Sequence, residues 1–134
     1  QRGVRAVVIF EGVNDIGAAA FGQSETVAND LIYAYEEMIR KAKERNLRVY
    51  LGTITPFKGA GYYSAFHEAA RQTVNQWIRS QREKVDGILD FDDLLRDPND
   101  PERLQKHWQS DWLHPNPEGY RAMGEYAAGV ITCR

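Results

Sequence analysis

Two residues near the end of the chain have the types and the spacing of a general base and the acid that orients it. Asp111 and His114 stand three positions apart in the segment Asp-Trp-Leu-His-Pro. Histidine titrates near neutral pH, so it can take a proton from a nucleophile, and a carboxylate at Nδ1 fixes its tautomer and stabilises the imidazolium. The alternative is a pair of solvated loop residues, because this spacing often arises by chance.

A second candidate, Asn14, follows an apolar run of the sequence. The run from Val4 to Phe10 leads into Gly12-Val13-Asn14-Asp15. A side-chain amide in such a loop can donate its N–H groups to a developing oxyanion. Glycine, asparagine and aspartate are also ordinary turn residues, so a plain turn is the alternative.

The apolar pattern around these residues alternates between strand-like runs and helix-like periods. Strands are predicted at 4–10, 48–55 and 88–91, and helices at 24–46, 64–82 and 117–130. Ser24, Ser64 and Asn116 are the expected helix caps. The buried stripe of the helix 64–82 is predicted to comprise Phe66, Ala69, Ala70, Thr73, Val74, Trp77 and Ile78. Residues 92–107 are expected to form a long loop, with a turn of helix after Pro101.

The order of these elements predicts a three-layer α/β/α sandwich with a parallel sheet, because strands that alternate with helices are joined by right-handed crossovers. Ligands of such sheets bind beyond the carboxyl ends of the strands. The predicted loops at that edge are 11–15, 55–63 and 92–116. They bring Asn14, Asp111 and His114 together from distant parts of the chain.

Two of these segments resemble sequence blocks of the SGNH (GDSL-type) esterase and lipase superfamily. Gly12-Val13-Asn14-Asp15 resembles the block G-x-N-D, and Asp111-Trp112-Leu113-His114 resembles the block D-x-x-H. The resemblance implies the family's flavodoxin-like SGNH hydrolase fold, hydrolysis of carbohydrate acetyl esters or short-chain acyl esters and lipids, and neither a metal nor an organic cofactor. It also implies that Asn14 donates to the oxyanion, that His114 is the general base and that Asp111 orients it.

Four residues are expected to contact the substrate: Gly12, Phe57, Tyr62 and Trp112. The three aromatic side chains could line a pocket for an acyl or sugar group, or they could pack beneath the loops. His67 lies off the apolar stripe of its predicted helix, so we expect it at the surface.

The family's nucleophile block, G-D-S, has no counterpart in the chain. The serines are Ser24, Ser64, Ser80 and Ser110, and none directly follows a predicted buried strand. The apolar run 4–10 would also leave an unpaired strand edge, which natural proteins avoid. We therefore expect residues 1–134 to be the C-terminal part of one larger SGNH domain. A missing N-terminal segment or a second chain would complete it, and the chain alone would be inactive as a serine esterase.

Charge and composition narrow the remaining classes. The net charge of −2 argues against nucleic acid as a partner, and no apolar run approaches the ~18 residues of a membrane span. Relatives with this pattern are often secreted, but the sequence leaves the compartment open. One alternative is a non-catalytic α/β binding domain of the same architecture. Another is a metal-dependent hydrolase built on Glu11, Asp15, Asp111 and His114, in which only one ligand would be a histidine.

Overall fold

The computed structural model describes residue 3 and residues 5–132. Val4, which we expected to begin the first strand, lies outside the described residues. In chain order the elements are β1 (Ala6–Ile9), α1 (Val13–Ala18), α2 (Ser24–Glu44), β2 (Arg48–Gly52), α3 (Ala65–Ser80), β3 (Gly87–Leu89), α4 (Phe91–Leu95), β4 (Arg96–Asp97), β5 (Asp100–Leu104), the 3-10 helix η1 (Lys106–Trp108) and α5 (Pro117–Thr132).

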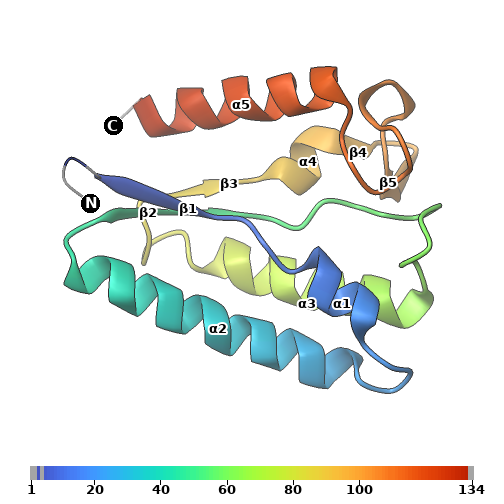
Figure 1. The fold of residues 1–134 in the computed structure, drawn as a ribbon, viewed down its shortest axis with the longest axis horizontal. Helices are drawn as coiled ribbons and strands as arrows, with labels where there is room; N and C mark the ends of the chain where they lie inside the picture. Colours follow the sequence, from blue (N-terminus) through green and yellow to red (C-terminus); the bar gives the residue numbers. More distant parts are fainter. Residues whose placement is uncertain (1–2, 4, 133–134) are drawn as a thin grey trace.

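Three parallel strands form the centre of the molecule, in the order β1-β2-β3. Leu51 of β2 lies opposite Ile9 on one side and Ile88 on the other. α2 and α3 cover one face of this sheet, and α5 covers the other (Figure 1). The predicted sandwich of a parallel sheet between two helical layers is confirmed. None of the described helices is long and apolar enough to cross a bilayer.

β1 lies at the edge of the sheet. Among the described residues it pairs with β2 alone. Val8 is 45% exposed and Phe10 is 41% exposed. The structure thus shows the unpaired apolar edge that the sequence predicted, and an edge of this kind favours pairing with a further strand.

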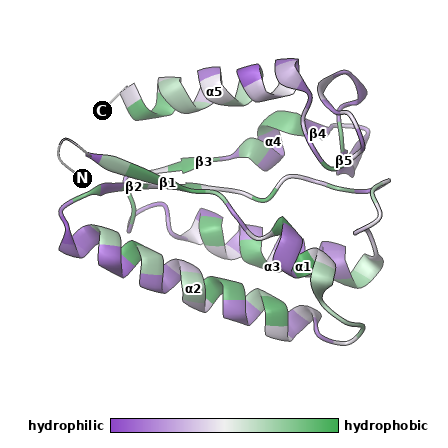
Figure 2. Cartoon of the chain, viewed as in Figure 1, coloured by the Kyte–Doolittle hydropathy of each residue, from purple (hydrophilic) through white to green (hydrophobic). Residues whose placement is uncertain are grey.

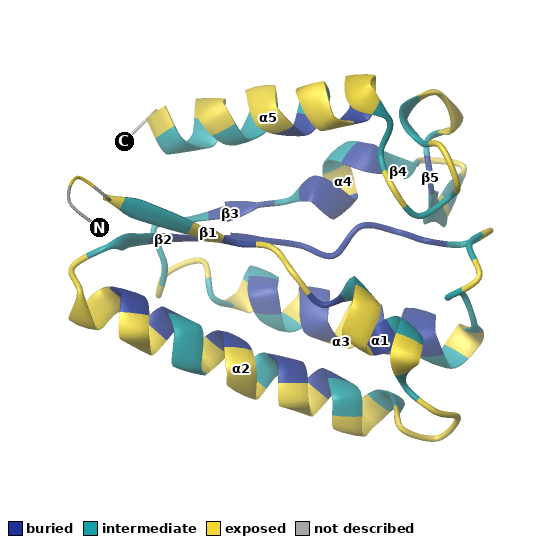
Figure 3. Cartoon of the chain, in the orientation of Figure 1, coloured by how far each residue is buried: buried dark blue, intermediate teal, exposed yellow. Residues whose placement is uncertain are grey.

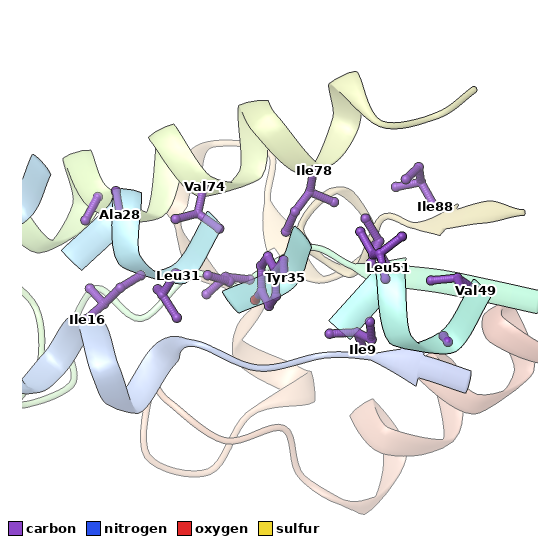
Figure 4. Close-up of a cluster of buried hydrophobic side chains, with 14 of the residues drawn as sticks. Ile9, Ile16, Ala28, Leu31, Tyr35, Val49, Leu51, Val74, Ile78 and Ile88 are labelled. Carbon is purple, nitrogen blue, oxygen red and sulfur yellow. The ribbon is translucent and has the colours of Figure 1, made fainter. Parts of the chain in front are cut away.

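Two apolar clusters fill the spaces on either side of the sheet. The larger joins the sheet to α1, α2 and α3, and its members include Ile9, Ile16, Leu31, Tyr35, Val49, Leu51, Val74 and Ile78 (Figure 4). The smaller joins the sheet to α4 and α5 through Tyr50, Leu89, Phe91, Leu95, Leu104 and Met123. Successive residues of β2 enter opposite clusters, which explains why the strand is apolar without alternation. The helices accordingly turn hydrophobic, buried faces inward and polar, exposed faces outward (Figures 2 and 3).

α3 buries more polar surface than its apolar spacing predicted. Ala69 and Thr73, expected on the buried stripe, are exposed, whereas Asn75 is fully buried. Oδ1 of Asn75 accepts from the N–H of Ile54 at 2.7 Å, and Nδ2 donates to the carbonyl of Ile54 at 2.8 Å. Ile54 lies just beyond the end of β2. The helix therefore supplies, from a side chain, the backbone hydrogen bonds that the sheet no longer provides there.

A buried network of ion pairs joins α3 to the start of α4. Arg71 donates to both carboxylate oxygens of Glu68 at 2.8 Å and to Asp92 at 2.8 Å. Asp92 is 1% exposed and also accepts from Arg79 at 2.8 Å and from Arg96 at 3.3 Å. Because α4 follows β3 directly, the network fixes the carboxyl end of the sheet.

The segments expected to be loops contain further short elements. α1 occupies part of the loop predicted after β1, and α4 begins at Phe91, where the third strand was expected to end. Asp90 caps α4, since its side chain accepts from the N–H of Asp93 at 3.1 Å. The turn of helix predicted after Pro101 does not follow the proline directly, because residues Asp100–Leu104 form β5 and pair with β4 in an antiparallel hairpin. The helical turn of this segment comes later, as the 3-10 helix η1 at Lys106–Trp108.

Candidate active site

Asp111 and His114 form a hydrogen-bonded pair in the loop before α5. Oδ2 of Asp111 lies 2.8 Å from Nδ1 of His114. Oδ1 of the same carboxylate accepts from the N–H of Leu113 at 3.0 Å and from the N–H of His114 at 2.7 Å. The carboxylate therefore both folds the loop and orients the ring. In the neutral tautomer whose Nδ1–H donates to Asp111, Nε2 is the nitrogen that can accept a proton as a base.

Hydrogen bonds keep Asp111 ionised. They lower the pKa of its carboxyl group to about 2; the backbone N–H of His114 contributes most, followed by the His114 ring and the N–H of Leu113. The carboxylate thus stays charged over the whole range in which histidines usually titrate, so it stabilises the imidazolium whenever one forms. The His114 side chain is 62% exposed, which leaves its other nitrogen accessible.

Asn116, just before α5, anchors this loop through hydrogen bonds of its side chain. Oδ1 of Asn116 accepts from the N–H of Gly119 at 2.8 Å, so Asn116 is the helix cap that the sequence predicted. Its Nδ2 donates to the carbonyl of His107 at 2.9 Å. The N–H of Ser110 donates to the carbonyl of His114 at 3.1 Å. These bonds fix the segment in which the pair lies.

Trp112, between the two members of the pair, has a left-handed backbone with a φ of 63°. The backbone N–H of Trp112 donates to Oε1 of Gln109 at 2.6 Å. Its ring packs on Gly59, where a Cβ atom would come within 2.8 Å of the indole. The guanidinium of Arg103 lies 4.8 Å from the ring centroid. The indole is thus held against the loop that follows β2, which supports the packing interpretation of Trp112.

Asn14 lies in the first turn of a helix rather than in a loop. Gly12, just before α1, has a φ of 119°, and a Cβ there would come within 3.0 Å of Ile54 and within 3.3 Å of the Tyr35 hydroxyl. Glycine is therefore required where the chain turns from β1 into α1. The Asn14 side chain is on the exposed side of the helix, and its Oδ1 accepts from the hydroxyl of Tyr62 at 3.2 Å.

The loop after β2 contacts both sides of the site. Tyr62 in this loop donates a hydrogen bond to Asn14. Gly59, in the same loop, packs on the ring of Trp112, which lies two residues before His114. The segments concerned lie at the edge where the parallel strands end, at the right of Figure 1. The structure therefore links Asn14 and the Asp111–His114 pair through one short loop, at the edge predicted from the sequence.

The residues expected to contact substrate have different surroundings. Phe57 is fully buried in the larger cluster, and this supports the packing alternative for it. Gly12 is buried, whereas Tyr62 and Trp112 are partly exposed. A hollow of about 70 Å³ lies between the ends of β1 and β2, lined by Phe10, Glu11, Val13, Ile54 and Thr55. A wider depression of about 510 Å³ lies between α1 and α2, and its lining includes neither Asp111 nor His114.

The four serines make contacts of their own. Ser64 caps α3 by accepting from the N–H of His67 at 3.1 Å, as expected. Ser24 is the first residue of α2 rather than its cap, and its hydroxyl donates to the carbonyl of Phe66 at 2.8 Å. The hydroxyl of Ser80 donates to the backbone of its own helix. Ser110 donates to the carbonyl of His114 at 3.3 Å, on the backbone side of that residue.

The surface position predicted for His67 is wrong. Its side chain is buried, with Nδ1 2.5 Å from the carbonyl of Tyr62 and Nε2 2.9 Å from the carbonyl of Ala19. Nothing in the apolar pattern signals this, because His67 is buried among backbone carbonyls rather than on the apolar stripe. In the described part of the chain, no three histidine, cysteine or acidic side chains are grouped so that they could hold a metal ion.

Solved structures with this fold are longer than the chain. The chain aligns with a GDSL-like lipase from Bacteroides thetaiotaomicron at 19% identity and a TM-score of 0.74, covering 96% of the chain and 63% of that protein. A G-D-S-L family lipolytic protein from Desulfitobacterium hafniense aligns at 25% identity and a TM-score of 0.73, covering 93% and 64%. An acylhydrolase from Bacteroides fragilis aligns at 22% identity and a TM-score of 0.71, covering 95% and 61%. The chain thus spans less than two thirds of each of these proteins.

A search among curated proteins found no relative of the chain. A model of the GDSL-like lipase/acylhydrolase family, in contrast, matches residues 1–122. This match covers β1 through the first turns of α5 and includes Asn14, Asp111 and His114. The chain belongs to the GDSL-like lipase/acylhydrolase family.

Proposed function

We propose that the chain is the base-bearing part of a serine ester hydrolase. His114 is the general base and later the general acid, Asp111 orients it, and Asn14 donates its side-chain amide to the tetrahedral oxyanion. The observation that carries the proposal is the bond between Asp111 and Nδ1 of His114, which leaves Nε2 free on an exposed ring. Membership of an acylhydrolase family supports the same reaction.

The nucleophilic serine comes from a segment that precedes these residues in the complete protein. That segment adds a parallel strand to the exposed edge of β1, and the end of such a strand lies at the edge of the sheet that carries Asn14 and His114. Support comes from the unpaired edge of β1, from the exposed side chains of Val8 and of Phe10 just after the strand, and from the greater length of the solved relatives. Without the serine, no acyl-enzyme can form, so the 134 residues alone are inactive.

The substrates are carbohydrate acetyl esters or other short-chain acyl esters. The hollow of about 70 Å³ at the ends of β1 and β2 supports a short acyl group, because it has room for few atoms. Its lining is mainly apolar, as an acyl pocket requires.

The test compares two proteins with p-nitrophenyl acetate as substrate: the 134-residue chain, and the product of the complete reading frame that encodes it. We expect no turnover by the first and turnover by the second, with a loss of at least ~10³-fold in kcat on His114→Ala. His107→Ala is the matched control. This exposed histidine lies beside Trp108, and its substitution should leave kcat unchanged. Turnover by the 134-residue chain that depends on His114 would refute the proposal, and so would full activity of the complete His114→Ala protein.

A further inference from the structure

Tyr62 makes a contact that bears on how Asn14 can act. Its hydroxyl donates to Oδ1 of Asn14 at 3.2 Å, across a separation of 48 residues in sequence. An asparagine amide presents an acceptor oxygen on one side and a donor NH₂ group on the other. When the oxygen is engaged by Tyr62, the NH₂ group points to the opposite side. A flipped amide would instead present its oxygen where a developing oxyanion needs a donor.

From this geometry we propose that Tyr62 is a positioning residue, which holds the side-chain amide of Asn14 in the orientation that donates to the oxyanion. The inference rests on the proposed function of Asn14. A donor that is already oriented stabilises the transition state without reorganisation. Tyr62 thus acts through Asn14 rather than as a wall of the substrate pocket.

Gly17 provides the space that this contact requires. A Cβ at Gly17 would come within 2.4 to 2.6 Å of three atoms of the Tyr62 ring, closer than any side chain could tolerate. Gly17 lies three residues after Asn14, so the two share one face of α1. A glycine inside a helix is less stable than an alanine there, because it loses more backbone freedom on folding. At this position the cost is offset by a contact that places the tyrosine ring over the first turn of the helix.

The backbone of Tyr62 is fixed relative to the same helix. His67, at the start of α3, has one ring nitrogen 2.5 Å from the carbonyl of Tyr62 and the other 2.9 Å from the carbonyl of Ala19. Ala19 ends α1. The His67 ring therefore lies between the backbone of Tyr62 and the end of the helix that carries Asn14, and its single N–H in the neutral form can donate to one of the two carbonyls. His67 thus packs the backbone of Tyr62 close to α1, the helix that carries Asn14.

The neighbouring tyrosine gives a matched control. The hydroxyl of Tyr63 donates to Oε1 of Glu102 at 2.5 Å, on β5, and not to Asn14. This bond raises the pKa of Tyr63 to about 12. Tyr63→Phe thus removes a hydrogen-bonded hydroxyl from the same loop and leaves the amide of Asn14 untouched.

The first experiment uses the 134-residue chain and does not depend on activity. The side-chain NH₂ signals of Asn14 are assigned by their loss in Asn14→Ala, and followed in ¹H–¹⁵N correlation spectra. Tyr62→Phe should shift these signals, and Gly17→Ala should shift them as well because it displaces the ring. Tyr63→Phe should leave them in place. Unchanged Asn14 signals in Tyr62→Phe would overturn the inference.

The second experiment measures hydrolysis of p-nitrophenyl acetate by the protein of the complete reading frame. Tyr62→Phe should lower kcat by about 3- to 10-fold with KM unchanged, the effect of one neutral hydrogen bond. In an Asn14→Ala background the same substitution should cost nothing more, because its target is gone. An equal loss in both backgrounds would mean that Tyr62 acts on the substrate itself. If the unsubstituted protein were inactive, the proposed function would fail, while the spectra would still decide the role of Tyr62.

Discussion

Arg71 offers the sharpest test of how the carboxyl end of the sheet is held in place. It is fully buried and donates four hydrogen bonds, two to Glu68, one to Asp92 and one to the carbonyl of Ile54. Bonds to charged groups contribute ~1.5–3 kcal/mol each, so their simple sum would exceed the whole stability of many domains. Asp92 keeps its bonds to two other arginines when Arg71 is replaced, and Glu68 keeps its bond to Gln72. We therefore expect Arg71→Met to lower the free energy of unfolding by about 3–5 kcal/mol, the cost of breaking a buried pair.

The assay is urea unfolding of the 134-residue chain, followed by circular dichroism. For a slope of ~2 kcal/mol per M, the expected loss lowers the midpoint by about 2 M. Arg40→Met is the control, because Arg40 also bonds two carboxylates, Glu37 at 3.0 Å and Glu44 at 2.7 Å, but on the exposed side of α2. Met and Arg have similar helix propensities, and exposed ion pairs contribute little, so Arg40→Met should leave the midpoint nearly unchanged.

Arg71→Lys keeps the charge but loses the planar fork, so its midpoint should lie between those of the wild type and Arg71→Met. It also keeps the comparison measurable if Arg71→Met does not fold. Midpoints for the Arg71 and Arg40 variants that agree within error would refute the reasoning, since burial would then add nothing to the energy of the ion pairs.

Two further predictions concern the segment around the candidate base. The carboxyl pKa of Asp111, followed by ¹³C shifts, should be about 2 in the wild type and should rise towards the ordinary ~3.9 in His114→Ala. Because the pKa is lower in the folded state than in the unfolded state, the stabilisation by this carboxylate is present above about pH 4 and is lost as the pH falls through 2. An unchanged Asp111 pKa would mean that the imidazole contributes nothing to it. In α5, Gly119→Ala should lower the free energy of unfolding by about 1–3 kcal/mol, because a Cβ at this position would come within 2.4 Å of the Trp108 carbonyl oxygen. Gly124→Ala should raise the free energy of unfolding by about 0.5–1 kcal/mol, because a Cβ there would meet no atom within 4 Å. Equal effects of the two alanines in urea unfolding would contradict the close approach at Gly119.

The parts of the fold that sequence predicted best are those whose apolar residues repeat with a clear period. Short apolar runs predict β1, β2 and β3, and apolar spacing with end signals such as Asn116 predicts α2, α3 and α5. The six residues of α1 contain glycine, asparagine and aspartate, which are typical of turns, so local composition favoured a loop. The hairpin of β4 and β5 has mostly polar strands, and its stability comes from packing against distant elements that no local pattern reveals.

The sequence predicted the pairing of Asp111 with His114, but not the contacts that support the candidate site. Asp111 and His114 could be expected to pair because their spacing closes a tight loop. The buried positions of Arg71 and His67 could not, because each depends on partners brought by other elements, and apolar periodicity places charged residues on the surface. The Tyr62–Asn14 bond likewise joins residues far apart in sequence. Contacts of this kind arise from the tertiary structure alone.

A strand that pairs with the exposed edge of β1 can come from the same chain or from a second copy, and the direction in which it runs distinguishes the two. A strand from the same chain that reaches this edge through a helical crossover runs parallel to β1. Two copies of the chain joined through β1 about a twofold axis would instead place their β1 strands antiparallel, since each strand must face its own image. If the axis passed through the middle of β1, Val8 would lie near its counterpart in the other copy, and a cysteine at this one position could cross-link the two chains. Pairing within one chain gives no such symmetric contact, and the two arrangements are therefore distinguishable by the mass of the oxidised product.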